Sequence, residues 1–409
     1  MRRRDRRFRT ALTVLAAWSA LAGAALTGAA PADGAPRTRT VAPGIQYSQF
    51  DIPAAHGTTR AHLLTVDLRN KHVRVDLLYP GAVAARASVS RLADAQGAVA
   101  GINGDFFNIS ETQHPGVEAT GSAVGPAITD GHTLKAAVPR GQRFGPALPP
   151  GTSTEDVLGV GTDRTARLDR LSLTGSLITP EGRLPLRGLN QYALPQGSIG
   201  AYTADWGSAS RVRATCGTDT NRGGPCSRDT YEVTIKNEQV VATADAPGKG
   251  PIAPGTTVLL GREAGAQQLR KLFQGEEVQV EQRLVAASSG VPYLFAIGGF
   301  PVLRHGAPVS GLDGATSAVR TAVGIRDGGR RLLLLATDGA APYRSGLTLA
   351  EVAGTLRKLG ATEGFNLDGG GSTTLVTRSP GASTATVRNH PSGGVERSVA
   401  DGIGVFADS

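Results

Sequence analysis

Carboxylate side chains follow three of the apolar runs in this sequence, and each lies in a loop that contains glycine. Asp105 follows the run Ala98–Ile102, Asp338 follows Leu332–Ala336, and Asp368 precedes three glycines and a serine. A rigid scaffold often presents reactive groups on the loops at strand ends. A carboxylate there can act as a general base or stabilise developing positive charge. The candidate catalytic residues are therefore Asp368, Asp338 and Asp105.

An arginine and two glycine clusters accompany these acids. Arg320 precedes the run Thr321–Ile325, and a guanidinium can hold a phosphate through two parallel hydrogen bonds. Glycines let a backbone N–H approach a ligand closely, and successive N–H groups form an anion-binding concavity. We therefore predict that an anionic substrate contacts the arginine and the clustered glycines. These residues are Arg320, Gly298, Gly299, Gly369, Gly370 and Gly371.

Each of these residues also has a purely structural interpretation. An Asp-Gly pair such as Asp338-Gly339 is more often a turn than an active site. Arg320 is equally compatible with a buried ion pair, and Ser372 is compatible with the cap of a turn. The loop after Asp368 favours function more strongly, because so many consecutive glycines need a reason.

Several common catalytic and metal-binding motifs are absent from the sequence. There is no Gly-x-Ser-x-Gly elbow in a suitable context, no His-Glu-x-x-His zinc motif and no Gly-x-x-x-x-Gly-Lys phosphate loop. The sequence has seven histidines, two cysteines and one methionine, so we predict no transition-metal site and no required cofactor. A calcium or magnesium ion held by aspartates and loop carbonyls remains an open alternative.

Two segments that lead to an acid resemble each other. Residues Gly97–Asp105 and Gly360–Asp368 are identical at five of nine positions. Each follows a helical pattern, Ser88–Gln96 in the first case and a stretch after the capping-box pair Thr348 and Glu351 in the second. We predict a helix-strand-loop unit used twice, with chance similarity in a Gly/Ala-rich chain as the alternative.

The other patterns are mainly those of strands. Alternation over His62–Leu68 and Val73–Leu77 predicts a hairpin. Short alternating runs separated by Gly and Pro fill residues 131–289, with one short helix expected over Gly265–Phe273. We predict an α+β fold with a mixed β-sheet core and flanking helices, plus an inserted β-rich segment.

The N-terminus has the pattern of an export signal. Met1–Arg9 carries six arginines and one aspartate, Ala11–Ala30 is uncharged, and Ala30–Ala32 suits cleavage. We expect a signal peptide over residues 1–32, a flexible linker over residues 33–44, and a secreted protein. A transmembrane anchor is the alternative.

The charge distribution excludes two classes of binding partner, and the cysteines predict a disulfide. The net charge is +9, but the leader supplies +5 of it, and no basic run follows. We therefore predict no nucleic-acid partner, and no membrane partner after the signal is cleaved. Cys216 and Cys226 flank a Gly/Pro/Asn loop, which in an exported protein predicts a disulfide, with half a zinc site as the alternative.

The ordered motifs resemble a known family. The motifs are GINGDFFN at residue 101, AIGGFPVLRHG, RTAVGI, LLLLATDG, NLDGGGSTTLV and the stretch from Arg388 to Arg397. Together they are similar to the phosphodiester glycosidases, over residues 45–130 and 290–407. The resemblance implies a catalytic domain of residues 45–130 and 290–409, interrupted by a β-rich insert of residues 131–289 that carries the disulfide loop.

The resemblance also implies an activity and further site residues. The activity would be hydrolysis of a sugar-1-phosphodiester, with an N-acetylglucosamine-type sugar and a phosphomonoester as products. The substrate would be a carbohydrate phosphate, with an envelope or capsular polymer among the candidates. Additional substrate-binding residues at polar family positions are Asn103, Thr321, Asn366 and Ser372. This chain has Asp105 where many family members have a glycine.

Two other functions fit the same loops. One is an O-glycosidase that acts on a cell-wall or capsular glycan, and Arg320 favours the phosphodiester over it. The other is a surface glycan-binding protein without catalysis. The aromatic content of 5% argues against this second function, because sugar binding without catalysis depends on aromatic stacking surfaces.

Overall fold

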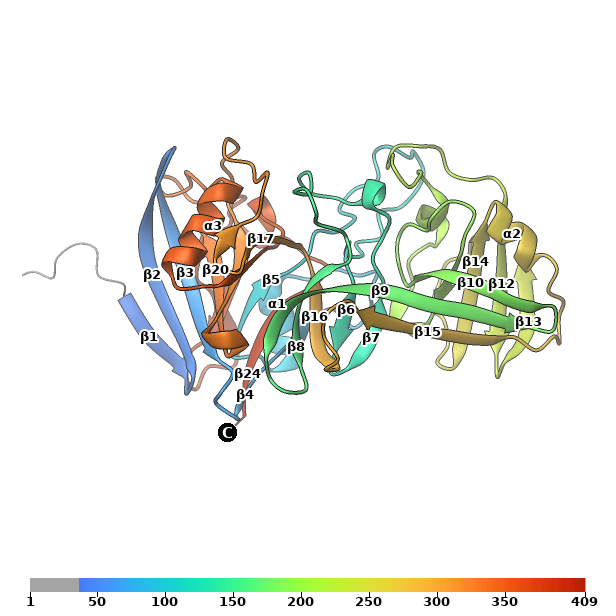
Figure 1. Cartoon of the computed structure of the whole chain (residues 1–409), viewed down its shortest axis with the longest axis horizontal. Coiled ribbons are helices and arrows are strands. Elements are labelled where there is room, and N and C mark those ends of the chain that lie inside the picture. The colour runs from blue at the N-terminus through green and yellow to red at the C-terminus, as the bar shows by residue number, and fades with distance from the viewer. Residues whose placement is uncertain (1–36, 409) are drawn as a thin grey trace, which may run out of the picture. The chain divides into compact units, whose positions relative to one another are not determined.

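A computed structural model describes residues 37–408, so the predicted signal peptide lies outside the described residues. An eight-stranded antiparallel sheet contains both early and late parts of the chain (Figure 1). Its order is β1 (Arg37–Ala42), β2 (Ile45–Ala54), β3 (Gly57–Asp67), β20 (Arg331–Thr337), β19 (Thr321–Arg326), β21 (Glu363–Asn366), β17 (Phe300–Arg304) and β18 (Ala307–Pro308).

A five-stranded sheet also joins distant parts of the chain. Its order is β23 (Ala385–Val387), β22 (Leu375–Arg378), β5 (Ala100–Asn103), β24 (Gly402–Ala407) and β4 (Val73–Leu78). Leu64 and Val323 of the first sheet share a buried core with Ile102 and Val405 of this one. The two sheets therefore pack face to face.

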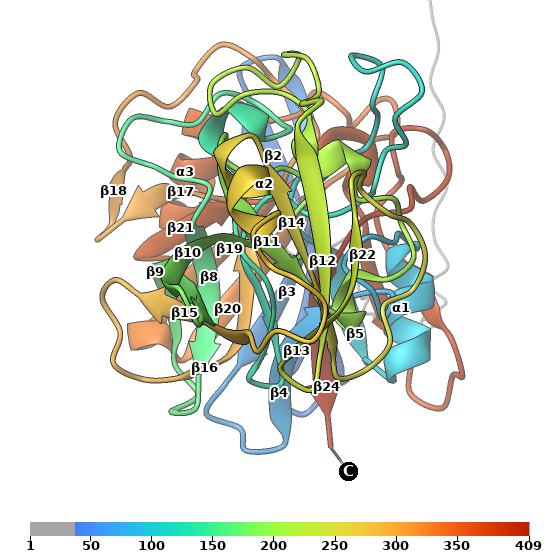
Figure 2. The same ribbon diagram turned by 90° about the vertical axis from the view of Figure 1, so that its right-hand side faces the viewer.

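One helix covers the outer face of each sheet, so that the order of layers is α3, sheet, sheet and α1 (Figure 2). The helix α3 (Leu349–Lys358) packs Leu356 against Gly324 and Gly364 of the eight-stranded sheet. The helix α1 (Val89–Gln96) packs its buried side chains against the five-stranded sheet. The missing side chains at the two glycines bring helix and sheet close together.

The caps of both helices agree with the sequence patterns. Ser88 caps α1, and Gly97 follows it with a left-handed φ of 75°. Thr348 and Glu351 form a reciprocal capping box at the start of α3. Gly360 also has a left-handed φ, 85°, but it lies one residue beyond the C-cap.

An 11-stranded sheet occupies most of the middle of the chain. Its order is β13 (Gln239–Ala244), β12 (Thr230–Lys236), β14 (Thr256–Arg262), β11 (Ile199–Tyr202), β10 (Gly182–Leu189), β9 (Ala166–Thr179), β8 (Asp156–Gly161), β16 (Tyr293–Gly298), β6 (Ala127–Thr129) and β7 (His132–Lys135), with β15 (Gln279–Ala286) paired to β9. The short helix α2 (Ala264–Leu269) forms within the range predicted for it, except that it begins one residue earlier.

Three expectations need correction. The fold is mainly β, and the helices are minor, so α+β describes it only loosely. The predicted linker contains a strand, because the backbone of β1 pairs with β2. The predicted hairpin is wrong, since β3 pairs with β2 and β20 whereas β4 pairs with β24. Alternation shows which side chains face a core, but it does not identify the partner strand.

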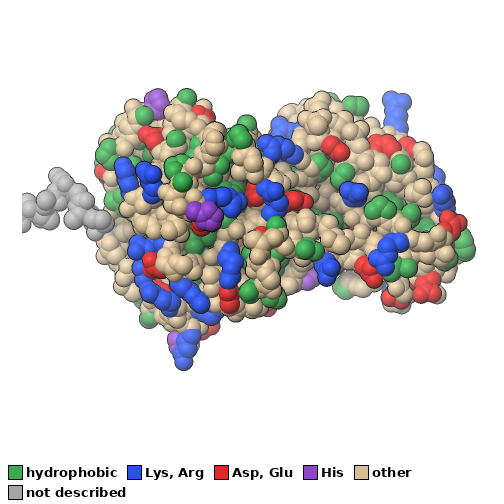
Figure 3. Space-filling view, viewed as in Figure 1, with side chains coloured by type: hydrophobic (Ala, Val, Ile, Leu, Met, Phe, Trp, Pro, Cys, Tyr) green, Lys and Arg blue, Asp and Glu red, His purple; other side chains and the backbone are tan. Residues whose placement is uncertain are grey.

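The surface of the described part mixes charges of both signs. Basic and acidic side chains lie interspersed over the face drawn in Figure 3. Among residues 37–408, no helix has the length and apolar character needed to cross a membrane.

The predicted disulfide between Cys216 and Cys226 is confirmed, and it closes a loop of sequence separation 10. Replacing both cysteines by alanine should lower the free energy of unfolding by about 3 kcal/mol, because the unfolded chain regains the entropy of that loop. Urea denaturation of the variant and of the wild type would measure the difference. Reduced wild type serves as the control, and equal stability of the reduced and oxidised protein would contradict the expectation.

Candidate active site

The two similar loops predicted from the sequence meet each other at the ends of β5 and β21. The side-chain amide of Asn103 donates to the carbonyl of Asp368 at 2.7 Å. The backbone N–H of Asp368 donates to the carbonyl of Gly104 at 2.9 Å. These bonds join the five-stranded sheet to the eight-stranded sheet at one point.

The surroundings of the two loops are also related. The N–H of Gly104 donates to the carbonyl of Asp401 at 3.0 Å, just before β24, and the N–H of Leu367 donates to the carbonyl of Thr321 at 2.9 Å, at the start of β19. Each loop is therefore fixed by the strand that pairs with its own strand. The helix-strand-loop unit occurs twice, as the sequence suggested.

Four of the predicted binding residues form a buried support behind Asp368. They are Asn103, Thr321, Asn366 and Ser372. The Thr321 hydroxyl donates to Asn103 Oδ1 at 2.8 Å and lies 3.1 Å from the Thr373 hydroxyl. The Asn366 side-chain amide donates to the carbonyl of Leu367. These side chains hold the loops and do not line the cleft described below.

Asp105 lies inside the protein with Asp401 and Lys135. Its carboxylate accepts from the N–H groups of Phe106 at 2.8 Å and Gly125 at 2.6 Å. Asp401 Oδ1 accepts the N–H of Asp105 at 2.8 Å. The Lys135 ammonium donates to backbone carbonyls, among them Ala136 at 2.8 Å.

The protons in this cluster follow from burial. Burial and the charge of Asp105 raise the pKa of Asp401 to about 8, and burial raises the pKa of Asp105 as well. Burial lowers the pKa of Lys135 to about 8 against the attraction of both acids. Because Asp105 accepts two N–H bonds and Asp401 accepts only one, we assign the negative charge to Asp105 and the proton to Asp401.

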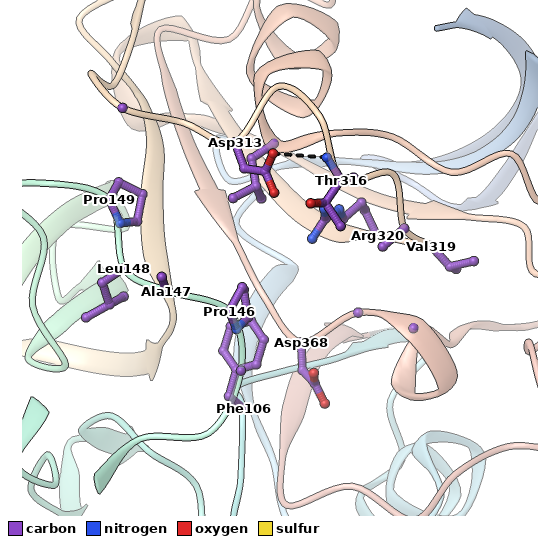
Figure 4. A pocket seen from close by; sticks show the side chains of 16 residues that line it. Phe106, Pro146, Ala147, Leu148, Pro149, Asp313, Thr316, Val319, Arg320 and Asp368 are labelled. Atoms are coloured by element: carbon purple, nitrogen blue, oxygen red, sulfur yellow. Dashed lines mark hydrogen bonds between the residues drawn. The ribbon is translucent and has the colours of Figure 1, made fainter. Parts of the chain in front are cut away.

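A cleft of about 560 Å³ opens beside Asp368. Asp313, Thr316 and Arg320 lie on one side of it, and Phe106 and Asp368 lie on another (Figure 4). Pro146 and Leu148 complete an apolar wall. The cleft thus places a cationic side chain and a carboxylate around one space.

Asp368 is the carboxylate best suited to proton transfer. Burial raises its pKa to about 6, although the Ser372 hydroxyl bond and the charge of Arg397 act in the opposite direction. A base with a pKa near neutrality can both accept and release a proton under ordinary conditions. Asp368 alone among the three predicted acids lines the cleft.

Arg320 has no carboxylate within ion-pair distance among residues 37–408. Its Nε donates to the carbonyl of Leu347 at 2.8 Å, and one Nη donates to that of Thr316 at 2.9 Å. Arginine has five N–H donors, so three remain. The guanidinium is therefore oriented by the backbone and keeps donors for an anion in the cleft.

Asp338 lies outside the cleft, and its carboxylate oxygens already have hydrogen-bond partners. Its oxygens contact His390 Nδ1 at 2.9 Å and His62 Nε2 at 3.3 Å, and accept the N–H of Ala340 at 3.0 Å. Burial raises the pKa of Asp338, but these bonds outweigh burial and hold that pKa below its ordinary value. Asp338 is thus arranged as a fixed charge that positions two imidazoles.

The predicted glycines divide into two groups. Gly369 and Gly370 line the cleft, but the Gly369 N–H already bonds to the Asp368 carboxylate and the Gly370 N–H to the carbonyl of Val319. Gly371, which packs against the Arg397 side chain, does not line it, and neither do Gly298 and Gly299. A methyl group at Gly298 would collide with the Asp105 carboxylate. A methyl group at Gly299 would collide with the Phe365 ring, so Gly298 and Gly299 permit close packing.

The described residues contain one cluster of side chains with metal-ligand spacing, formed by His114, Cys216 and Cys226. Both sulfur atoms are in the disulfide, and His114 is bonded to Glu111 at 2.5 Å and to the carbonyl of Gly224 at 2.7 Å. The cluster is therefore engaged in other bonds.

Three residues of the site were not singled out from the sequence. Asp401 lies just before β24, which pairs with β5 as β19 pairs with β21. It therefore occupies the place that Thr321 has in the other half of the repeat, and this equivalence is a signal that could have identified it. Arg397 donates to the Ser372 hydroxyl at 3.2 Å. It is the last residue of the motif stretch from Arg388 to Arg397. Lys135 had no local signal, because only the tertiary fold brings it to Asp105.

Residues 229–406 match the family model of the phosphodiester glycosidases. The family resemblance inferred from the motifs is thus confirmed over residues 290–406, which contain Arg320, Asp338, Asp368 and Asp401. The match also includes residues 229–289, which the sequence had placed in the insert. The loop from Asn103 to Asp105 lies outside the matched residues. No curated protein matches the chain.

Solved structures share the fold. One is a hypothetical protein from Synechocystis, with a TM-score of 0.69 and 21% identity over 91% of this chain and 64% of that one. Another is a putative exported protein from Burkholderia pseudomallei K96243, with a TM-score of 0.65 and 23% identity over 85% and 74% of the two chains. The chain thus spans less than two thirds of the length of the Synechocystis protein.

A third structure is the catalytic domain of zebrafish N-acetylglucosamine-1-phosphodiester alpha-N-acetylglucosaminidase, auto-inhibited by its pro-peptide. It aligns with a TM-score of 0.45 and 16% identity over 90% of this chain and 86% of that one.

The proton on Asp401 should appear in the pH dependence of stability. Folded Asp401 keeps its proton to about pH 8, whereas the unfolded side chain loses it near pH 4. Between these values unfolding releases a proton, so stability falls as pH rises, by up to about 1.4 kcal/mol per pH unit. Replacing Asp401 by asparagine keeps an acceptor for the Asp105 N–H and should flatten this slope.

Urea denaturation at several pH values would measure the slope. The exposed Asp245, whose side chain is 90% accessible, provides the control variant Asp245→Asn, which should keep the slope of the wild type. Identical slopes in the Asp401→Asn variant and the wild type would show that Asp401 is ionised in the folded protein.

Proposed function

We propose that this chain is an exported hydrolase that removes a sugar from a glycosyl phosphodiester. The observation that carries the proposal is the cleft in which Arg320, free of any carboxylate partner in the described chain, shares one space with Asp368, whose pKa is raised to about 6. A cation for the phosphate and a base for water are the two groups that this hydrolysis needs. The family match over residues 229–406 supports the same reaction class.

Asp368 serves the sugar end of the substrate. Its carboxylate accepts a proton from a water molecule as the water oxygen attacks the anomeric carbon. The bond between that carbon and the phosphate oxygen breaks, and the phosphomonoester leaves with the bonding electrons. The negative charge of Asp368 also stabilises the oxocarbenium-like centre that forms on the way.

Arg320 serves the phosphate end. Charge develops on the phosphate oxygens as the bond breaks, and a guanidinium that is already oriented stabilises this charge without reorganising. Its bonds to the carbonyls of Leu347 and Thr316 supply that orientation. Because two of the loop amides are engaged, Arg320 carries more of this task than the glycine loop does.

Asp105 and Asp338 support the site from outside the cleft. Asp105 raises the pKa of Asp368 through its charge, which favours the proton-accepting role at neutral pH. Asp338 orients His390, whose chain segment continues to Ser392 and contacts the carbonyl of Gly370. Neither acid is assigned to a reacting atom.

The sugar, the aglycone and the export of the protein belong to the same proposal. An N-acetylglucosamine-type sugar follows from the family resemblance, and the apolar wall of Phe106, Pro146 and Leu148 offers a surface for one face of a sugar ring. The disulfide fits an oxidising compartment outside the cytoplasm. The reaction is proposed to proceed without a required cofactor.

Replacing Asp368 by asparagine should lower kcat for a sugar phosphodiester by about a hundredfold or more, because general-base catalysis is lost. In the wild type, kcat/KM should rise with pH through about 6, as Asp368 ionises. Release of free sugar from a synthetic N-acetylglucosamine phosphodiester would measure both effects. The matched control is Asp313→Asn, another carboxylate of the cleft, which should retain most activity. Undiminished turnover by Asp368→Asn would remove this residue from the mechanism.

Replacing Arg320 by glutamine tests the phosphate end. The variant should lose about tenfold to a hundredfold in kcat/KM for the sugar phosphodiester, as expected for lost hydrogen bonds to a charged group. It should change little for the matched aryl glycoside, which has no phosphate. Equal losses on both substrates would favour an ordinary O-glycosidase, and tight binding of glycan without product would favour a binding protein.

A further inference from the structure

Two arginines lie side by side at the free edge of the eight-stranded sheet. Arg39 of β1 and Arg388, just after β23, both donate to the hydroxyl oxygen of Thr377, at 2.9 Å and 2.6 Å. Two guanidinium groups that share one acceptor must lie within a few ångström of each other. Burial and the charge of Arg39 accordingly lower the pKa of Arg388, but an arginine remains charged in a protein.

No carboxylate compensates this pair in the described chain. Neither Arg39 nor Arg388 makes an ion pair with any residue of 37–408. The Arg39 guanidinium lies 4.9 Å from the centre of the Tyr47 ring, which fixes its direction. Both arginines and Tyr47 line a hollow of about 340 Å³, together with Gln49. Like charges held together around a hollow, with no anion from the protein, form a site that an external anion would stabilise.

The position of the pair relates it to the cleft. The strands from Arg39 to Thr321 follow in the order β1, β2, β3, β20 and β19. Four strand spacings separate the first from the last, which is roughly 20 Å. Arg39 and Thr321 both point to the five-stranded sheet, because their partners are Thr377 and Asn103.

One chain segment connects the two places. It begins with Arg388 at the arginine pair, and Ser392 within it contacts the carbonyl of Gly370 at the cleft. It ends with Arg397, which donates to the Ser372 hydroxyl. Between them, His390 has a side chain that is 70% exposed. The segment therefore places Arg388 at the hollow and Arg397 at the Ser372 hydroxyl, behind the glycine loop of the cleft.

We propose that Arg39 and Arg388 form a second anion subsite, which holds a remote phosphate of a chain-like, phosphate-linked glycan while another of its phosphodiesters lies in the cleft. This inference rests on the proposed function for the reaction at the cleft. It names the substrate class as a polyanionic chain, since a single sugar phosphodiester is too short to reach both places. A guanidinium pair is suited to phosphate because its parallel donors match two phosphate oxygens.

Binding tests the subsite without turnover. The protein would carry Asp368→Asn to prevent cleavage, and calorimetry would compare a chain of several N-acetylglucosamine-1-phosphate repeats with a single N-acetylglucosamine phosphodiester. Replacing Arg39 and Arg388 together by glutamine should weaken chain binding about tenfold, as expected for lost charge-assisted hydrogen bonds. Affinity for the single diester should stay the same. The milder variant Arg39→Gln should show a smaller loss in the same direction and leaves Thr377 bonded to Arg388.

A matched control separates the site from net charge. Arg91 and Arg283 are exposed and make no ion pair with residues 37–408, so replacing both by glutamine removes the same charge elsewhere. The proposal is overturned if this control weakens chain binding equally, or if the Arg39 and Arg388 variants bind the chain as tightly as the parent. It is also overturned if these variants lose binding only to vesicles of anionic phospholipid, which would indicate a membrane contact.

Turnover then distinguishes the two proposals. With Asp368 restored, the double variant should raise KM for a chain with terminal sugar phosphodiesters about tenfold and leave kcat and the small substrate unchanged. If neither substrate is cleaved by the wild type, the proposed function fails, whereas the binding result still decides whether the arginine pair holds a polyanion.

Discussion

The backbone bond between the Asp368 N–H and the Gly104 carbonyl, with the Asn103 side chain beside it, is the constraint on which the site depends. It joins the ends of two strands that belong to different sheets. The sheets pack through a shared apolar core, and this polar junction fixes how the ends of β5 and β21 align. Because these bonds hold the two loops together, Asp368 lies at the edge of the cleft.

The two loops of the junction share residue types, but their aspartates lie in different surroundings. Asp105 and Asp368 occupy equivalent positions of the repeat, yet Asp105 is enclosed by Gly125, Asp401 and Lys135, whereas Asp368 borders open space. Enclosure makes Asp105 a fixed charge that no substrate touches. Burial raises the pKa of Asp368, and the charge of Asp105 adds to this effect. In the proposed function, the repeat thus gives Asp105 an electrostatic role and Asp368 the role of the base.

The sequence predicted those features that depend on residues close together in the chain. The caps of α1 and α3, the strand ends that carry Asp105 and Asp368, and the disulfide all depend on residues near each other in sequence. Strand partners are different, because β3 and β4 alternate as a hairpin would but pair in separate sheets. The bonds from Asp338 to His62 and His390, and the position of Lys135 near Asp105, depend on residues far apart in the sequence, for which there is no periodic signal.

The placement of Asp338 gives this acid a role consistent with its isolation from the cleft. Its carboxylate binds His62 within the eight-stranded sheet and the imidazole and N–H of His390 outside it. His390 lies in the segment that runs from Arg388 to Arg397. A carboxylate whose pKa is held low stays charged at any ordinary pH, so it fixes this segment permanently. The same acid therefore holds the middle of the segment whose ends bond to Thr377 through Arg388 and to the carbonyl of Gly370 through Ser392. For the proposed chain-like substrate, the fixed separation of the arginine pair from the cleft requires a minimum chain length.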